Sequence, residues 1–175
     1  MESLIFSLDG RDDLVKEILS EAGKWDMELN TDFGSVRNQK FSDGELCVDF
    51  TDSVRGKRVY LLTSPNISDE VVKLTLAIDA AKRAGAKEIV PILPYFPYAR
   101  QDKKGRGREP ISARLMADLL KTAGADRIMS VDLHAAQIQG FFDGPVDHLW
   151  ALPMLADYVK DNFDDGNITV VSPDS

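Results

Sequence analysis

Short apolar runs of strand length alternate with helix-period segments along nearly the whole chain. Residues 4–8, 58–63 and 88–93 each have the length and apolar content of a buried strand. After the first run, apolar residues recur with helical spacing over 14–22. This repeated order predicts an α/β fold, with a mostly parallel sheet and helices on both of its faces.

Further elements follow from caps and turn residues. Ser68 as N-cap and Gly85 at the end frame one helix, and Pro110 at a first helical position and Gly124 past the end frame another. The residues expected to face the core from this second helix are Ile111, Leu115, Leu119 and Ala123. The remaining expected elements are an antiparallel strand entered through a turn at 41–45, strands over 127–134, 146–150 and 168–171, and a helix over 153–162.

Charge is distributed unevenly. The net charge is −8, but residues 100–108 carry +4 and the remainder therefore carries −12. The net charge argues against a protein whose whole surface binds nucleic acid, and a positive loop on an acidic protein predicts a small, highly charged anion as partner. No apolar run approaches the roughly 20 residues that span a bilayer, so no membrane association is expected. The single cysteine, Cys47, and the absence of a signal-peptide pattern favour the cytoplasm.

Asp132 and His134 lie two residues apart, late in an expected strand. At that spacing both side chains would project from one face of the strand, on the side of the sheet where α/β proteins bind ligands. A carboxylate beside an imidazole suits a divalent metal that holds phosphate oxygens, or an acid/base pair. The alternative is structural, with His134 bonded at the strand end and Asp132 capping the next helix.

A second candidate site runs from Tyr95 to Lys104, where aromatic residues leave a strand and cations follow. Such rings can stack on a base, and Arg and Lys can hold phosphates. Two alternatives stay open: core aromatics followed by a solvated basic loop, or a non-specific nucleic-acid contact. The turn Phe41-Ser42-Asp43-Gly44-Glu45 could bind a ribose or a base edge, although such turns are common.

Together these segments resemble the ribose-phosphate pyrophosphokinase family. The resemblance covers residues from about 40 to the end of the chain, and residues 1–39 match only loosely. The matching strings are Phe41-Ser42-Asp43-Gly44-Glu45, Ser53-Val54-Arg55-Gly56, Tyr98-Ala99-Arg100-Gln101-Asp102-Lys103-Lys104, Arg108-Glu109-Pro110-Ile111-Ser112-Ala113, Asp132-Leu133-His134-Ala135, Gln137-Ile138-Gln139-Gly140-Phe141-Phe142-Asp143 and Val170-Val171-Ser172-Pro173-Asp174.

The resemblance implies a type I phosphoribosyltransferase-like fold and transfer of the diphosphoryl group of Mg-ATP to ribose 5-phosphate, giving phosphoribosyl pyrophosphate and AMP. It implies Arg100 and His134 as catalytic residues. The residues implied to contact ATP are Phe41, Asp43, Gly44, Glu45, Arg100, Gln101 and Lys103. The residues implied for the Mg²⁺–phosphate cluster are His134, Asp174, Asp132 and Asp143. A homo-oligomer built from dimers, such as a hexamer, is also implied, because the 41–45 loop reaches a neighbour's ATP site in this family.

Family chains are nearly twice as long. The resemblance therefore implies an N-terminal domain over 1–150 and the start of a second, incomplete domain over 151–175. Segments that grip ribose 5-phosphate and supply the catalytic Lys and Arg are missing from the 175 residues, so this chain alone is expected to turn over negligibly. The alternative is a non-catalytic, nucleotide-binding regulatory subunit of the same family.

Overall fold

The computed structural model describes residues 1–24, 30–66, 68–163 and 169–171. The strands are β1 (Ser3–Ser7), β2 (Thr31–Phe33), β3 (Val36–Lys40), β4 (Leu46–Phe50), β5 (Arg58–Leu62), β6 (Glu88–Leu93), β7 (Ile128–Val131) and β8 (Val146–Leu149). The helices are α1 (Asp12–Lys24), α2 (Ser68–Arg83), α3 (Ser112–Ala123), α4 (Leu152–Asn162) and the short 3-10 helix η1 (Ala136–Gly140).

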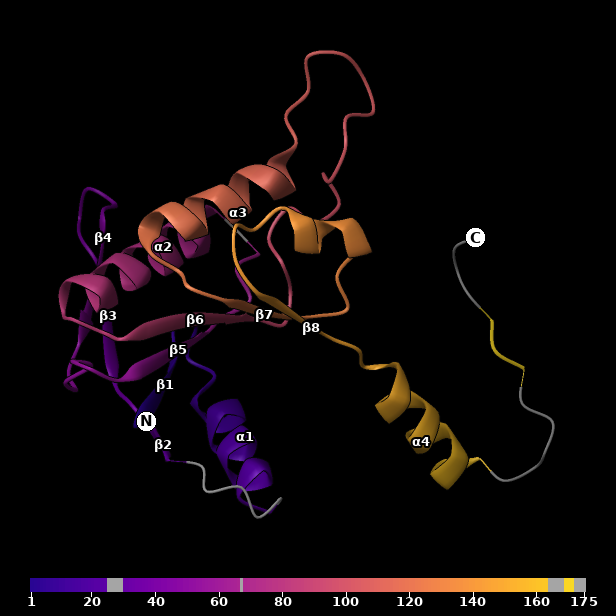
Figure 1. Cartoon of the computed structure of the whole chain (residues 1–175), viewed down its shortest axis with the longest axis horizontal. Coiled ribbons are helices and arrows are strands. Elements are labelled where there is room, and N and C mark those ends of the chain that lie inside the picture. The colour runs from indigo at the N-terminus through magenta and orange to yellow at the C-terminus, as the bar shows by residue number, and fades with distance from the viewer. Residues whose placement is uncertain (25–29, 67, 164–168, 172–175) are drawn as a thin grey trace.

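Six strands form a parallel sheet in the order β2-β1-β5-β6-β7-β8, and β3 and β4 form a separate antiparallel hairpin (Figure 1). Alternate residues of a strand point to opposite faces. Leu4 and Phe6 accordingly join the large core cluster that α2 and α3 cover, whereas Ile5 packs with Val15 of α1. Helices therefore cover both faces of a mostly parallel sheet, which confirms the predicted fold class.

The buried face of α3 is not the one expected from the sequence. Its buried side chains are those of Ser112, Ala113, Met116, Ala117 and Leu120. The expected Ile111, Leu115 and Leu119 are 37%, 51% and 40% exposed, and Ala123 is only partly buried. The helix also begins at Ser112, two residues after Pro110. The physical reason is close helix packing: α3 lies against α2, and alanines let the two backbones approach.

The hairpin of β3 and β4 confirms the antiparallel strand expected after the 41–45 turn. It packs over α2, and Phe50 at its end meets Phe6 of the sheet with ring centroids 4.7 Å apart in an edge-on arrangement. The turn itself is therefore held at the far tip of a hairpin whose base is anchored in the core.

The C-terminal part of the described chain lies apart from this core. α4 has no buried residue and projects away from the sheet (Figure 1). The strand expected over 168–171 is not observed for residues 169–171, which are unpaired, and Val170 and Val171 are 89% and 81% exposed; residue 168 lies outside the described residues. A strand needs a hydrogen-bonded neighbour, and no described strand pairs with this segment.

No helix in the described part of the chain is long and apolar enough to cross a membrane.

Candidate active site

The basic loop (residues 100–108) lies between β6 and α3. Arg100, Gln101 and Lys103 are exposed, whereas the Asp102 between them is only 7% exposed. The three exposed residues help to line a hollow of about 440 Å³, together with Gly105, Glu109 and Pro110. Among the described residues, none of the five cations in this loop takes part in an ion pair. They are therefore free to hold an anion.

Both ends of the basic loop are fixed by hydrogen bonds. The Ser112 hydroxyl lies 2.6 Å from Gln101 Oε1, and the Ala113 N–H donates to the Gln101 carbonyl. At the other end, Glu109 Oε2 accepts from the N–H groups of Gly105 and Arg106 at 2.9 and 2.8 Å. The side-chain oxygen of Gln101 is thus directed to α3, and the cations project from an anchored loop.

The aromatic residues before this loop divide between core and surface. Phe96 is buried, but Tyr95 and Tyr98 are 44% and 38% exposed. The two exposed rings line a second hollow, of about 340 Å³, with Arg100 and the beginning of α2. The Tyr98 hydroxyl lies 3.3 Å from Ser68 Oγ there. Exposed rings beside a guanidinium can stack on a base. The alternative that these aromatic residues belong to the core therefore holds for Phe96 but not for Tyr95 and Tyr98.

The expected pairing of Asp132 and His134 on one strand face is wrong. β7 ends at Val131, and Asp132 has φ of +43°, a left-handed backbone that breaks the two-residue alternation. We call residues 132–134 the His134 turn. Its Asp132 and His134 side chains are exposed, and only Leu133 between them is buried, with 9% of its surface exposed. The sharp turn still exposes both polar side chains at the carboxyl end of the strand.

Three hydrogen bonds from the exit of β8 hold the His134 turn. The Leu133 N–H donates to His148 Nε2 at 3.0 Å. The Asp132 N–H donates to the Leu149 carbonyl at 2.9 Å, and the Ala151 N–H donates to Asp132 Oδ1 at 3.2 Å. One carboxylate oxygen of Asp132 is thus used in a bond to the segment after β8. Asp132 does not cap the next helix, as the structural alternative expected, because η1 has no side-chain hydrogen bond at its N-cap.

The basic loop and the His134 turn are joined through a buried carboxylate. Gln137, in η1, donates to Asp102 Oδ2 at 2.6 Å. Because η1 follows the turn directly, this bond fixes the beginning of the basic loop, at Asp102, to the segment just after His134. The structure thereby brings together two of the three segments singled out in the sequence.

The implied metal ligands do not gather into a closed set. Asp143 is exposed beyond η1, and Asp174 lies outside the described residues. Within the described ranges, no group of three or more His, Cys, Asp or Glu side chains could hold a metal ion. An imidazole and a carboxylate on one exposed turn fit the supporting part of a Mg²⁺ site, because Mg²⁺ takes one or two carboxylates plus substrate phosphates.

The turn of the β3–β4 hairpin makes its polar contacts internally. The Phe41 N–H donates to the Glu45 carbonyl at 2.8 Å, and the Glu45 N–H donates to Asp43 Oδ1 at 3.1 Å. Gly44 has φ of +96°, which favours glycine at that position. Phe41 is 45% exposed at the tip of the hairpin. An exposed ring and two carboxyl groups on a rigid tip are thus presented outward.

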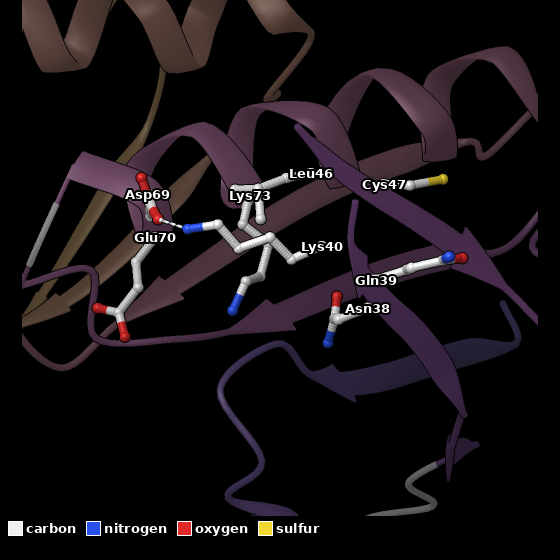
Figure 2. Close-up of a pocket in the computed structure, with 8 residues that line it drawn as sticks. All are labelled: Asn38, Gln39, Lys40, Leu46, Cys47, Asp69, Glu70 and Lys73. Atoms are coloured by element: carbon white, nitrogen blue, oxygen red, sulfur yellow. Dashed lines mark hydrogen bonds and ion pairs between the residues drawn. The ribbon is translucent and has the colours of Figure 1, made fainter. Parts of the chain in front are cut away.

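The turn end of the hairpin meets α2 around a hollow of about 300 Å³ (Figure 2). Lys40 and Asp69 form an ion pair of 2.7 Å across it, and Lys73 Nζ donates to the Leu8 carbonyl at 3.4 Å. The Lys40 hydrogen bond is the main cause that lowers the pKa of Asp69 below its ordinary value. This pairing fixes the hairpin on the helix that begins near the tyrosine-lined hollow.

Two residues of this region were missed in the sequence, His148 and Gln137. His148 was visible as one of only two histidines, within the expected strand over 146–150, but nothing in its spacing pointed to residue 133. Gln137 belongs to one of the sequence strings that resemble the family, but no contact was expected for its side chain. Both act through contacts between segments far apart in the chain.

Comparison with known proteins agrees with this architecture. Residues 3–124 match the N-terminal domain of ribose phosphate pyrophosphokinase. Ribose-phosphate pyrophosphokinase of Corynebacterium efficiens is 56% identical over 159 residues, which are 90% of this chain and 48% of the relative. The Mycobacterium leprae relative of the same name is 49% identical over 174 residues, covering 98% of this chain and 51% of that protein. The chain thus spans about half the length of these relatives.

A solved structure gives the same result in three dimensions. The crystal structure of phosphoribosylpyrophosphate synthetase from Mycobacterium smegmatis superposes with a TM-score of 0.83 at 46% identity, covering 94% of this chain and 54% of that one. The fold is the mostly parallel α/β sheet of the type I phosphoribosyltransferase-like class. The chain belongs to the ribose-phosphate pyrophosphokinase family.

Proposed function

We propose that the protein containing this chain is a ribose-phosphate diphosphokinase. It transfers the diphosphoryl group of Mg-ATP to ribose 5-phosphate and releases AMP. Membership of the family supports this proposal, and one structural observation carries it: the Asp102–Gln137 hydrogen bond joins the basic loop to η1, the short helix directly after the His134 turn. A polyphosphate chain needs cations and metal-supporting groups at one place, and this bond assembles them.

The division of tasks among the residues follows from where they lie. Arg100 and Lys103 are exposed and have no ion pairs among the described residues, and they would hold the ATP phosphates. Gln101 would support the basic loop through its hydrogen bond with Ser112 of α3. A planar guanidinium suits bidentate contact with phosphate oxygens. The exposed hairpin tip, with Phe41, Asp43, Gly44 and Glu45, would contact the adenine and ribose of an ATP bound by a neighbouring subunit. That assignment makes a homo-oligomer part of the proposal.

In the proposed reaction the anomeric hydroxyl oxygen of ribose 5-phosphate attacks the β-phosphorus of ATP. The bond from that phosphorus to the α,β-bridging oxygen breaks, AMP leaves, and the hydroxyl proton passes to solvent. Such a transfer needs alignment and cancellation of charge on the phosphoryl oxygens more than covalent help. Arg100 supplies positive charge, and His134 orients the phosphates. When bound, Mg²⁺ supplies further charge neutralisation, with His134, Asp132, Asp143 and Asp174 as the residues that would support it.

The ribose 5-phosphate site and the remaining catalytic groups are assigned to parts of the protein beyond the core described above. We propose that residues 1–150 form the N-terminal domain and that residues 151–175 begin a second one. The absence of any buried residue in α4 supports this division, since an amphipathic helix without a packing partner is expected to be covered by another domain.

Nucleotide binding by the protein that contains this chain is the first test of the proposal. Isothermal titration with Mg-ATP is expected to show binding that Arg100→Ala weakens about 10-fold or more, since a charge-assisted bidentate contact is lost. The matched control is Arg83→Ala, which removes an exposed arginine of α2 that pairs with Asp79. It is expected to leave the affinity unchanged.

A competition experiment separates this function from the alternatives. An excess of a single-stranded oligonucleotide should not displace ATP; displacement would favour a nucleic-acid contact instead. ATP binding without ribose 5-phosphate-dependent release of AMP would favour the non-catalytic regulatory subunit. Loss of ATP affinity in Arg83→Ala as well as in Arg100→Ala would remove the specific assignment of the basic loop.

A further inference from the structure

His148 is a partly buried histidine with a defined hydrogen bond and no part in the proposed chemistry. It lies in β8, and the strand is in parallel register with β7, so that Ser130 faces His148. Its Nε2 accepts the Leu133 N–H at 3.0 Å, and its ring stacks on Trp150 with centroids 4.2 Å apart. Because Nε2 is an acceptor here, the neutral ring carries its proton on Nδ1, which faces the side-chain amide of Gln139 at 3.4 Å.

The bond reaches a strained part of the backbone. Asp132 has φ of +43°, unfavourable for a residue other than glycine, and it lies between the end of β7 and the buried Leu133. Two of the three bonds that hold this segment come from the backbone of residues 149 and 151. The third bond comes from the His148 side chain. Of the three, it is the one that a substitution outside the turn can remove.

We infer that His148 is a positioning residue for His134. Without the imidazole, the largely buried Leu133 N–H has no acceptor, and the peptide between Asp132 and Leu133 is free to rotate away from the strained conformation. His134 is the next residue, so the direction in which its side chain leaves the turn would change. The inference rests on the proposed function for its catalytic consequence, but the geometric part stands on the hydrogen bond alone.

Two substitutions separate the acceptor from the bulk of the ring. His148→Gln keeps an oxygen near the place of Nε2, and His148→Leu keeps a similar volume without an acceptor. Both lose the contact with the Trp150 ring, so that loss cannot distinguish them. Thermal melting of both variants is measured first, because a purely structural residue would lower both melting temperatures without a difference in ligand affinity.

The functional arm uses the protein that contains this chain, with Mg-ATP titrated at fixed ribose 5-phosphate. We expect His148→Leu to raise the KM for Mg-ATP by about 10-fold, the lower end for outer-shell partners of metal-supporting residues, and His148→Gln to stay within about threefold of the parent. Equal KM values for the two variants would overturn the inference, whether both are raised or both are normal.

The spectroscopic arm needs no activity. In the parent, ¹⁵N spectra should show His148 with its proton on Nδ1, and the Leu133 amide should be protected from hydrogen exchange. In His148→Leu that protection should fall and the His134 ring signals should move, and in His148→Gln both should return toward the parent. An unprotected Leu133 amide in the parent, or no difference between the variants, would overturn the inference. If the parent shows this signature but makes no AMP, the proposed function fails and the positioning of His134 stands.

Discussion

Gln137 donates a hydrogen bond of 2.6 Å to the carboxylate of Asp102, a side chain that is only 7% exposed and lies 35 positions earlier. Buried carboxylates are costly unless they are hydrogen-bonded. The bond joins the cationic loop to the helical turn after His134, and it therefore sets the distance between two parts of the candidate active site.

Removing the acceptor should loosen both the fold and the site. Asp102→Leu is expected to lower the free energy of unfolding by about 1–3 kcal/mol, because the Gln137 amide loses its partner, and to raise the KM for Mg-ATP. Asp102→Asn keeps an oxygen that can accept from Gln137 and should cost clearly less. Denaturant unfolding and steady-state kinetics check the two effects. A double-mutant cycle with Gln137→Leu should give a coupling of about 0.5–3 kcal/mol; additive effects would contradict the link.

The two faces of α3 should respond differently to the same substitution. Leu120 is 1% exposed and Leu115 is 51% exposed on the same helix. Leu120→Ala should cost about 2–5 kcal/mol of unfolding free energy through lost burial and a cavity, whereas Leu115→Ala should change it by at most about 0.5 kcal/mol. Urea unfolding measures both. An equal cost for the two would mean that Leu115 is covered in the protein in solution.

The buried face of α3 was predicted wrongly from the sequence. The large residues Ile111, Leu115 and Leu119 recur every four positions and suggest a core face. The actual core face uses Ala113 and Ala117, whose small side chains allow close packing on α2 and give little hydrophobic signal. By contrast, β1, β5 and β6 were predictable, because strands buried on both faces are nearly continuous apolar runs.

Gly34 should not tolerate a side chain. A Cβ there would lie 2.3 Å from the buried ring of Phe6, which is packed against Phe50 and has no room to move. Gly34→Ala is expected to lower the free energy of unfolding by about 1–3 kcal/mol. Gly23→Ala is the control, since nothing lies within 4 Å of its Cβ and alanine favours the helix; it should stabilise by up to about 1 kcal/mol. Equal stability of the two variants in thermal or denaturant unfolding would contradict this packing.

The Lys40–Asp69 ion pair beside the turn of the hairpin predicts a pH effect. Lys40 lowers the pKa of Asp69 below its ordinary value of 3.8, chiefly through their hydrogen bond. The unfolded chain lacks this pair, so its contribution to stability is present above the ordinary value and is lost as pH falls through the lower, folded pKa. Lys40→Ala should return the pKa of Asp69 toward its ordinary value.

An NMR titration of the Asp69 carboxyl carbon measures this change. Lys16→Ala, which removes an exposed lysine of α1 that pairs with Asp13, should leave the Asp69 titration as it is in the parent. High salt should reduce the difference between the parent and Lys40→Ala, since the pair is exposed. An identical Asp69 titration with and without Lys40 would contradict the pairing.

The candidate site was predictable in its parts but not in its assembly. The cations of the basic loop were found from their residue types and their place after an expected strand, and the Asp132–His134 pair from its place late in another. The left-handed turn at Asp132 could not be predicted in this way. The same holds for the contact of His148 with Leu133, 15 positions away, and for that of Gln137 with Asp102, 35 positions away. Spacing along one strand cannot reveal such contacts, since they are set by how the strands are arranged in the sheet.

Ribose 5-phosphate-dependent release of AMP from Mg-ATP tests the central claim most directly. The protein containing this chain should form AMP only when both substrates are present. Arg100→Ala and His134→Ala should each lower kcat/KM by about 10²–10³-fold through lost electrostatic stabilisation, and Arg83→Ala should match the parent. AMP release that does not need ribose 5-phosphate, or that survives both substitutions undiminished, would contradict the account.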